Sequence, residues 1–380
     1  MDGNNYESNQ TVTVLGNTGT LVKTWFTYGG WTNSAGTLYA AGNTFAMGSA
    51  NVTLYAKWLP DTRIFGGTSY DSGYAVATDS NGNIFVTGYF LGTADFDPGA
   101  SADNKTSAGS GDVFLTKINS NGFYAWTKTF GGGAFDSGKS VTTDSSGNIF
   151  VTGYFDGTAD FDPGAGTDNK TSAGTNDIFL TKINSDGSYG WTKTFGGTDN
   201  EVDKSVATDS SGNIFVTGSF SGTADFDPGA GTDNKTSVGA NDIFLSKINS
   251  DGTYGWTKTF GGTSFDEGSS VVTDSSGNIF VTGCFEGTID FDPGAGTDNK
   301  TSAGGSDIFL TKINSDGTYG WTKTFGGTSQ DVGYSVTKDS SGNIFVTGKF
   351  SGTVDFDPSA GTENKTSAGN DDIFLLIQTE

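Results

Sequence analysis

The stretch Phe65-Gly66-Gly67 recurs at a constant spacing through most of the chain. Its later copies begin at Phe130, Phe195, Phe260 and Phe325, each 65 residues after the one before. The residues after about position 62 therefore form five copies of one unit. Repetition on this scale decides the whole fold, because each copy is one supersecondary unit that cannot bury its apolar surface without its neighbours.

The second copy shows the secondary structure that one unit should have. Runs rich in β-branched and aromatic residues predict four strands, at 140–144, 149–155, 177–183 and 189–195. The tight turns 145–148 and 184–187 contain Gly and Asn, which supply or tolerate a positive φ, and so they make hairpins of the outer pairs. The polar stretch 160–174 contains Pro163 and several glycines, and it predicts a long loop rather than a helix or a central strand.

Four antiparallel strands per copy, with no helical period, are typical of a propeller blade. A single four-stranded sheet has two apolar faces and must pack against sister sheets around an axis. A linear solenoid fits less well, since solenoid units are usually shorter and have one or two strands. The expected fold is all-β: a five-bladed β-propeller of four-stranded antiparallel blades over residues 61–380, with a small N-terminal β-rich module over residues 1–60.

The two ends of the repeat region predict how the ring closes. Four copies end in a Trp-Thr-Lys-Thr-Phe strand, whereas the fifth ends without one, and a matching segment precedes the first copy. One missing strand and one additional strand would leave five complete blades with no open edge. The residues expected to pair in this ring closure are Arg63, Ile64 and Phe65 with Ile373, Phe374 and Leu375.

The repeated motifs resemble a known family. Asp-Ser-Ser-Gly-Asn-Ile-Phe-Val-Thr-Gly, Asp-Phe-Asp-Pro-Gly and Asp-Ile-Phe-Leu-Thr-Lys-Ile follow one another in the copies over about residues 62–380. They are similar to the bacterial β-propeller repeat (SBBP type) of large secreted proteins. The resemblance implies a propeller and an exported bacterial protein; the family is often associated with seven blades, whereas this chain offers five.

The first sixty residues predict a separate small β module. Apolar segments at 11–15, 25–31, 44–47 and 52–58 read as strands. The run from Gly29-Gly30-Trp31 to Trp58 resembles the Listeria–Bacteroides surface repeat, a β-grasp-like module, although the strand that usually opens that repeat has no match in residues 1–10. A sheet without one of its strands has a bare edge, so we expect this module to self-associate, and a fibre could result.

Composition excludes several classes of function. The chain of 380 residues has no His and one cysteine, Cys284, which removes the commonest general base and any disulfide or thiolate zinc site within the chain. The net charge of −23 opposes nucleic-acid binding and adsorption to anionic lipid. No apolar run is long enough for membrane insertion, and no signal peptide is seen at the start. Extracellular or bacterial cell-surface localisation follows from the family resemblance.

The repeated Asp-Phe-Asp-Pro-Gly loops are the candidate metal sites. Two carboxylates two residues apart share one face of an extended backbone, and oxygen-rich loops with Gly can bind calcium. Capping of turns explains the same residues, and the spacing of a full calcium loop is absent, so any calcium binding is expected to be weak. The residues are Asp95, Asp97, Asp160, Asp162, Asp225, Asp227, Asp290, Asp292, Asp355 and Asp357.

No catalytic constellation stands out. A glycosidase needs two different carboxylates in one asymmetric cleft, whereas five similar copies repeat every carboxylate five times. The expected protein is therefore not an enzyme, and calcium is its one candidate cofactor. We expect a structural, adhesion or filament module at the bacterial surface, with itself, a glycan or a cell surface as partner. The alternative is a lectin-like or calcium-dependent binding propeller, with the Trp residues of the fourth strands stacking on sugars.

Overall fold

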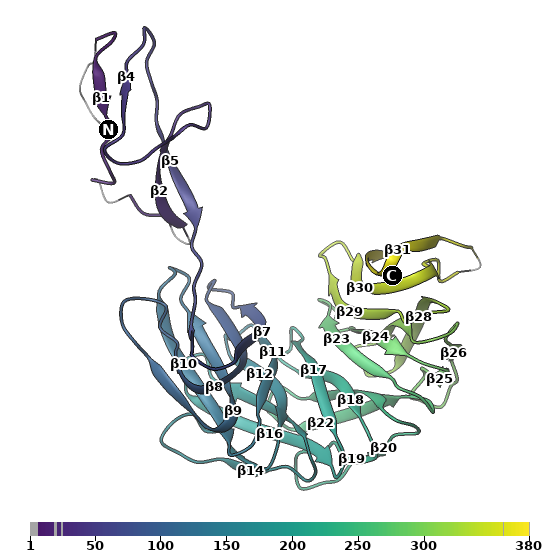
Figure 1. Ribbon diagram of the computed structural model, residues 1–380. Coiled ribbons are helices and arrows are strands. Elements are labelled where there is room, and N and C mark those ends of the chain that lie inside the picture. The colour runs from purple at the N-terminus through teal and green to yellow at the C-terminus, as the bar shows by residue number, and fades with distance from the viewer. Residues whose placement is uncertain (1–6, 19–20, 24–25, 360, 380) are drawn as a thin grey trace.

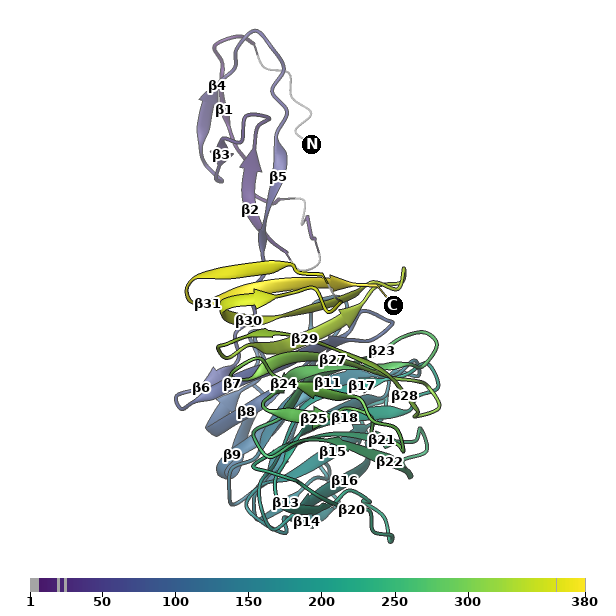
Figure 2. The same ribbon diagram turned by 90° about the vertical axis from the view of Figure 1, so that its right-hand side faces the viewer.

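The computed structural model describes residues 7–18, 21–23, 26–359 and 361–379, and every regular element in them is a β-strand. The strands after residue 66 are arranged as a curved row of antiparallel sheets, and the N-terminal strands project beyond that row (Figures 1 and 2). This arrangement is all-β and agrees with the propeller type of fold.

One sheet in the second repeat shows how the sequence makes the unit. Its main strands hydrogen-bond in the order β11-β12-β15-β16, all antiparallel. Gly147 and Gly187 adopt φ values of 79° and 85° at the two hairpin turns, as their turn chemistry requires. The four strands predicted for this copy are thereby confirmed: β11 (Ser137–Thr143), β12 (Ile149–Phe155), β15 (Asp177–Ile183) and β16 (Tyr189–Gly197).

The same pattern recurs in the other repeats, and we refer to units 1 to 5 in chain order. Unit 1 contains β7 (Asp71–Thr78), β8 (Ile84–Asp95), β9 (Asn104–Ile118) and β10 (Tyr124–Gly132). Unit 2 is the sheet described above. Unit 3 contains β17 (Glu201–Thr208), β18 (Ile214–Phe220), β21 (Asp242–Ile248) and β22 (Tyr254–Phe260). Unit 4 contains β23 (Glu267–Thr273), β24 (Ile279–Phe285), β27 (Asp307–Ile313) and β28 (Tyr319–Gly327). Unit 5 contains β29 (Val332–Lys338), β30 (Ile344–Asp355) and β31 (Asn364–Gln378).

The long polar loop of each unit contains a short additional hairpin that the sequence did not reveal. In units 2 to 4 it is formed by β13 (Thr158–Asp160) with β14 (Asn169–Thr171), β19 (Thr223–Asp225) with β20 (Asn234–Thr236), and β25 (Thr288–Asp290) with β26 (Asn299–Thr301). In units 1 and 5 the corresponding residues are continuous with the long strands β8, β9, β30 and β31. A threonine pair across the hairpin, such as Thr158 and Thr171 at 2.8 Å between hydroxyls, holds it together.

This hairpin also links neighbouring units. The end of β10 in unit 1 pairs with β13 in unit 2, with Gly131 opposite Asp160, and β16 and β28 pair with the next unit in the same way. We call each of these pairs a strand link. Among the described residues no strand link joins β22 of unit 3 to β25 of unit 4. A Cβ on Gly132 would lie only 2.0 Å from a carbonyl oxygen, so these links require glycine.

Four of the apolar cores in the described residues lie between neighbouring units, and a smaller one lies within unit 1. The core of the first junction combines side chains of unit 1 with side chains of unit 2, and Phe130, Phe161 and Phe179 meet there with ring centroids less than 6 Å apart. The first strands of neighbouring units also hydrogen-bond directly to each other. Thr208 Oγ1 in β17, for example, donates to the backbone carbonyl of Thr143 in β11. Each sheet therefore depends on its neighbours, as the repeat pattern predicts.

The predicted closing pair is not formed, and this prediction is wrong for the structure. Arg63, Ile64 and Phe65 lie away from Ile373, Phe374 and Leu375; in the described chain β31 pairs only with β30. The strand β6 (Gly66–Gly67) instead pairs with β8 of unit 1. Units 1 and 5 stand apart across the open side of the row (Figure 1). The physical reason is that the angle between units, which local sequence does not determine, sets where the row ends.

The N-terminal residues form two small sheets. β1 (Thr11–Thr13) pairs with β4 (Thr44–Ala46), and β2 (Phe26–Thr32) pairs with both β3 (Leu38–Tyr39) and β5 (Tyr55–Pro60). Tyr28 packs edge-on against Trp31 and Trp58. The four predicted strand segments correspond to β1, β2, β4 and β5, while residues 1–6 and 24–25 lie outside the described residues.

Candidate functional site

The acidic loops, our candidate metal sites, use their carboxylates to hold their own backbone. In unit 2, Asp160 Oδ1 accepts hydrogen bonds from the backbone N–H groups of Asp162 (3.0 Å) and Asp168 (2.9 Å). Asp162 Oδ1 accepts one from the N–H of Gly164 at 2.8 Å. Corresponding bonds occur in the other units. These are the turn-capping contacts that compete with metal binding for the same oxygens.

A third carboxylate anchors the loop to the fourth strand. Asp168 accepts a hydrogen bond from the Tyr189 hydroxyl and an ion-pair contact from Lys170 Nζ at 2.7 Å. Burial alone would raise the pKa of Asp168, but the bonds from Lys170 and Tyr189 outweigh it and lower that pKa. Burial and the bond to Asp168 raise the pKa of Tyr189. The contact thus fastens the loop as a structural element.

No three Asp, Glu or Cys side chains of the described residues gather as they would around a metal ion. The residues predicted for calcium, Asp95 and Asp97 with their equivalents, are brought together only as pairs within each loop. Weak calcium binding at these pairs stays a prediction.

A different set of carboxylates meets between units, and the sequence interpretation missed it. At the junction of units 1 and 2, an ideal Cβ on Gly131 would lie 2.8 Å from Asp112 Oδ1 and 2.8 Å from Asp136 Oδ2. The two carboxylates thus lie at most about 6 Å apart, where like charges disfavour each other's ionisation. Corresponding pairs are Asp177 with Glu201, Asp242 with Asp266, and Asp307 with Asp331.

These junction pairs are buried and incompletely hydrogen-bonded. Asp136 accepts bonds from the N–H groups of Gly132 and Asp156, and Asp112 Oδ2 accepts one from Ala108. Asp112 Oδ1 has no hydrogen-bond partner, and the same holds for the Oδ1 atoms of the three corresponding aspartates. The signal in the sequence was an acidic residue in fourth place after each Gly-Gly motif, in a segment that otherwise varies.

Burial dominates the protonation of these pairs. It raises the pKa of Asp136 to about 7 against two backbone hydrogen bonds, and the charge of Asp112 adds to the rise. Burial likewise raises the pKa of Glu201 to about 7 and that of Asp266 to about 6. The first two junctions therefore favour a state in which the pair holds a proton near neutral pH, and the pairs of the other two junctions take up a proton at about pH 6.

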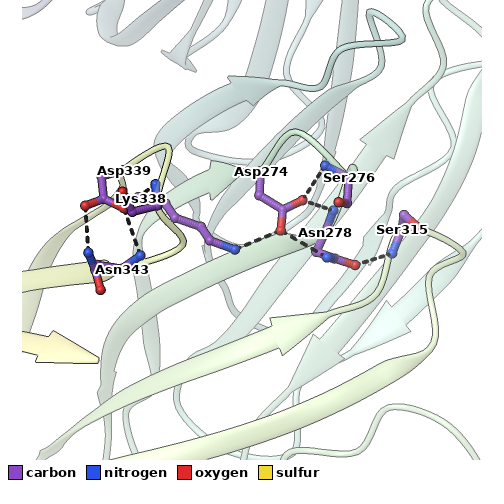
Figure 3. A network of polar contacts seen from close by, with 8 residues as sticks. Asp274, Ser276, Asn278, Ser315, Lys338, Asp339 and Asn343 are labelled. Carbon is purple, nitrogen blue, oxygen red and sulfur yellow. Dashed lines mark hydrogen bonds and ion pairs between the residues drawn. The ribbon is translucent and has the colours of Figure 1, made fainter. Parts of the chain in front are cut away.

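The tight turns at the innermost hairpins carry a polar network between units (Figure 3). Asp274 accepts hydrogen bonds from the backbone N–H groups of Ser276 and Asn278, both at 2.9 Å. Lys338 Nζ of the next unit reaches Asp274 at 2.9 Å, and both side chains are more than nine-tenths buried. Asn278 Oδ1 accepts from the N–H of Ser315 in the neighbouring turn. This ion pair locks unit 5 to unit 4.

The remaining candidates from the sequence are structural in this fold. The Trp residues of the fourth strands pack against the junction cores, as Trp126 does beside Phe85. Cys284 is buried, and burial raises the pKa of its thiol to about 12. A thiol with so high a pKa is a poor nucleophile.

Comparison with known proteins supports the repeat assignment. The beta-propeller repeat family matches at residues 62–89, 125–161, 190–223 and 320–349. A protein of Acanthamoeba polyphaga mimivirus described as an uncharacterized WD repeat-containing protein is 27% identical over 256 residues, 58% of this chain and 18% of that protein. The regulatory protein FlaEY of Caulobacter vibrioides is 27% identical over 228 residues, 54% of this chain and 23% of that protein.

The chain thus spans less than a quarter of the length of either relative. The expected resemblance to a β-propeller repeat is confirmed at the four matched segments, while the resemblance of the N-terminal module to a surface repeat stays a prediction. Within the described residues there is no helix with the length and apolar character to cross a membrane.

Proposed function

We propose that this protein is a non-enzymatic structural and assembly module of a bacterial cell surface or extracellular matrix. In this proposal five propeller-type blades form its body. The N-terminal module, taken as a surface-repeat unit, binds neighbouring molecules.

The observation that carries the proposal is where the large apolar side chains are exposed. Many lie on the N-terminal module: Leu15, Leu21, Val22, Phe26, Leu38, Val52, Tyr55 and Leu59. Others lie on the two terminal units of the row, whereas the inner units expose few. Concentrations of exposed apolar side chains on a polar protein are typical of interaction surfaces.

The small sheets of the module supply a second means of association. β1 and β4 form a two-stranded sheet, and β3, β2 and β5 form a three-stranded one. Sheets this narrow are marginal in isolation, and their free edges offer N–H and C=O groups to a strand from another chain. Edge pairing and apolar contact would act together in binding a neighbour.

The way the acidic residues are used also supports a non-enzymatic role. The recurrent loop carboxylates cap turns, and the junction carboxylates are buried between units. Near-identical units multiply each such group instead of placing two different carboxylates in one cleft, as a glycosidase needs.

Sedimentation velocity over a wide range of protein concentration tests the proposal. We expect species larger than the monomer for the native chain. Leu15→Lys and Tyr55→Lys, both at exposed positions of the module, should weaken association, while Phe123→Lys at a still more exposed position of unit 1 should not. A native chain that stays monomeric at every concentration would contradict the proposal, and binding to a glycan array would favour the lectin alternative instead.

A further inference from the structure

The internal junctions show what each face of a unit is made to contact. At the first junction, the preceding unit contributes its trailing face and the following unit its leading face. The trailing face consists of Phe85, Val113, Leu115 and Phe130, and the leading face includes Val141, Ile149, Val151, Phe155 and Phe161. The same positions form the next two junction cores. One pair of complementary faces is therefore used again and again.

Unit 5 has a trailing face with nothing against it. Ile373 and Leu375 of β31 are 84% and 67% exposed, whereas their equivalents Ile178 and Leu180 are completely buried at the second junction. Ile377 is also exposed, at a position where the other units have lysine. The outer edge of β31, which in other units binds a fourth strand, has no partner strand in the described chain.

Unit 1 has the matching leading face, whose Phe90 and Phe96 are already buried within unit 1 and whose Val76 is uncovered. Val76 is 67% exposed, compared with 6% for its equivalent Val141. Gly66 and Gly67 already pair with β8 as the end of a fourth strand does at an internal junction. Beside them is an open hollow of about 490 Å³ whose lining includes Ile64 and Asp71.

The hollow lies where an internal junction holds a second carboxylate. An ideal Cβ on Gly131 would contact both Asp112 and Asp136, whereas the three atoms nearest to an ideal Cβ on Gly66 all belong to Asp71, the equivalent of Asp136. The missing carboxylate corresponds to Asp372, which stands at the start of the apolar run of β31 and accepts a hydrogen bond from the N–H of Ala368, as Asp112 does from Ala108. The two ends of the row are thus the two halves of one junction.

We propose that these two faces bind each other between copies of this chain, head to tail, with residues 62–65 of one molecule adding as the fourth strand to β31 of the next. This inference rests on the proposed assembly function and names its partner, a second copy of the chain. The internal pairing of Ile178 with Phe195 sets the register. It places Ile373 opposite Phe65, Phe374 opposite Ile64 and Leu375 opposite Arg63 of the neighbour.

A second copy fits this contact better than the chain's own first unit. Units 1 and 5 stand apart, so closure within one chain would have to change the angles between units (Figure 1). A second molecule uses that geometry as it stands. Contacts between two different surfaces of identical chains propagate into a filament unless the rotation closes them into a ring.

Disulfide trapping tests the register directly. Two variants, Arg63→Cys and Leu375→Cys, are each made with Cys284→Ser, the residue that unit 3 has at that position. Directly opposed residues in an antiparallel pair have Cα atoms about 4.5–5.5 Å apart, within reach of a disulfide. We expect oxidation of the mixture to give a cross-linked dimer, oxidation of either variant alone to give none, and Arg63→Cys mixed with Val238→Cys to give none.

A chain that carries both cysteines separates the two ways of covering the faces. Intermolecular cross-linking into a ladder supports the proposal, while a cross-linked monomer shows closure within one chain and overturns it. In sedimentation, Leu375→Lys should weaken self-association at least tenfold, and Val238→Lys, at a position that is also 67% exposed, should leave it unchanged.

The outcomes also separate this inference from the function it rests on. If the chain assembles but neither cross-links nor responds to Leu375→Lys, the head-to-tail contact is wrong and assembly through the N-terminal module stands. If the chain is monomeric under all conditions, both are wrong.

Discussion

Replacing Asp112 with Asn should stabilise the protein at alkaline pH. Asp112 Oδ2 accepts a hydrogen bond from Ala108, while Oδ1 has no partner and faces the site it shares with Asp136. An asparagine can keep the carbonyl oxygen toward Ala108 and turn its NH₂ group toward Asp136. The substitution then removes one buried charge and gives the Asp136 carboxylate a hydrogen-bond donor.

The pKa of Asp136 sets the magnitude. It rises from 3.8 to about 7, mainly through burial. One pKa unit corresponds to about 1.4 kcal/mol, so ionising Asp136 at pH 8 costs the fold on the order of 4 kcal/mol. The charge of Asp112 causes a smaller part of this rise. The variant also no longer buries the charge of Asp112 itself. We therefore expect its free energy of unfolding to rise by on the order of 1 kcal/mol at pH 8.

The sign of the pH dependence follows from the raised pKa values. Unfolded carboxyls titrate near pH 4, while Asp136 and Glu201 titrate at about 7 and Asp266 and Asp307 at about 6 in the fold. The folded state binds more protons between these values, so the stability of the native chain should fall as pH rises from about 5 to 8. Below about pH 4 it should fall again, as carboxyls with lowered pKa values, such as that of Asp168, lose their charge.

Urea unfolding followed by tryptophan fluorescence at pH 5 and pH 8 measures both effects. The gain from Asp112→Asn should appear at pH 8 and shrink at pH 5. Asp112→Ala is the control for the lost hydrogen bond to Ala108, and Glu7→Gln on the exposed N-terminal residues is the control for net charge. If Asp112→Asn destabilises at pH 8 as much as Asp112→Ala does, the charge-repulsion argument is refuted.

Three further predictions concern other contacts. Lys338→Thr removes one partner of the buried pair with Asp274 and should cost about 3 kcal/mol, seen as a lower melting temperature; adding Asp274→Asn should recover part of that loss. Gly196→Ala puts a Cβ 2.4 Å from the carboxyl carbon of Asp177 and should destabilise by about 1–3 kcal/mol, while Gly133→Ala, with open space around it, should be nearly neutral in the same urea assay. Calorimetric titration with calcium should show weak binding at most, because the loop carboxylates already accept backbone hydrogen bonds; tight binding of one ion per unit would contradict this.

Local sequence was sufficient for the strands within a unit. The turn around Gly147 and the alternation in residues 149–155 act over a few residues, and β12 has the predicted bounds. The hairpin of β13 and β14 was hidden, because three-residue strands between glycines and Pro163 carry no periodic signal. Strands this short depend on pairing with a partner strand rather than on a pattern in their own sequence.

Contacts between units were harder to predict than the units themselves. The position of unit 5 relative to Phe65 depends on small angles added over four junctions, and no single motif encodes their sum. The burial of Asp136 was missed because Asp beside Ser and Gly is typical of an exposed turn. Its acidic equivalents in all five copies were the available sign. The loop aspartates were placed correctly as turn residues, one of the two roles that the sequence left open.

The strand links differ along the row, and that difference bears on mechanical strength. Gly131, Gly196 and Gly326 each sit in a strand link that fastens one unit to the next, but the described residues contain no such link from unit 3 to unit 4. A pulling force along the row loads all four junctions in series, so the junction with the fewest backbone bonds yields first. Stretched from its ends, the molecule should part between Phe260 and Glu267, releasing three units on one side and two on the other as separately folded blocks.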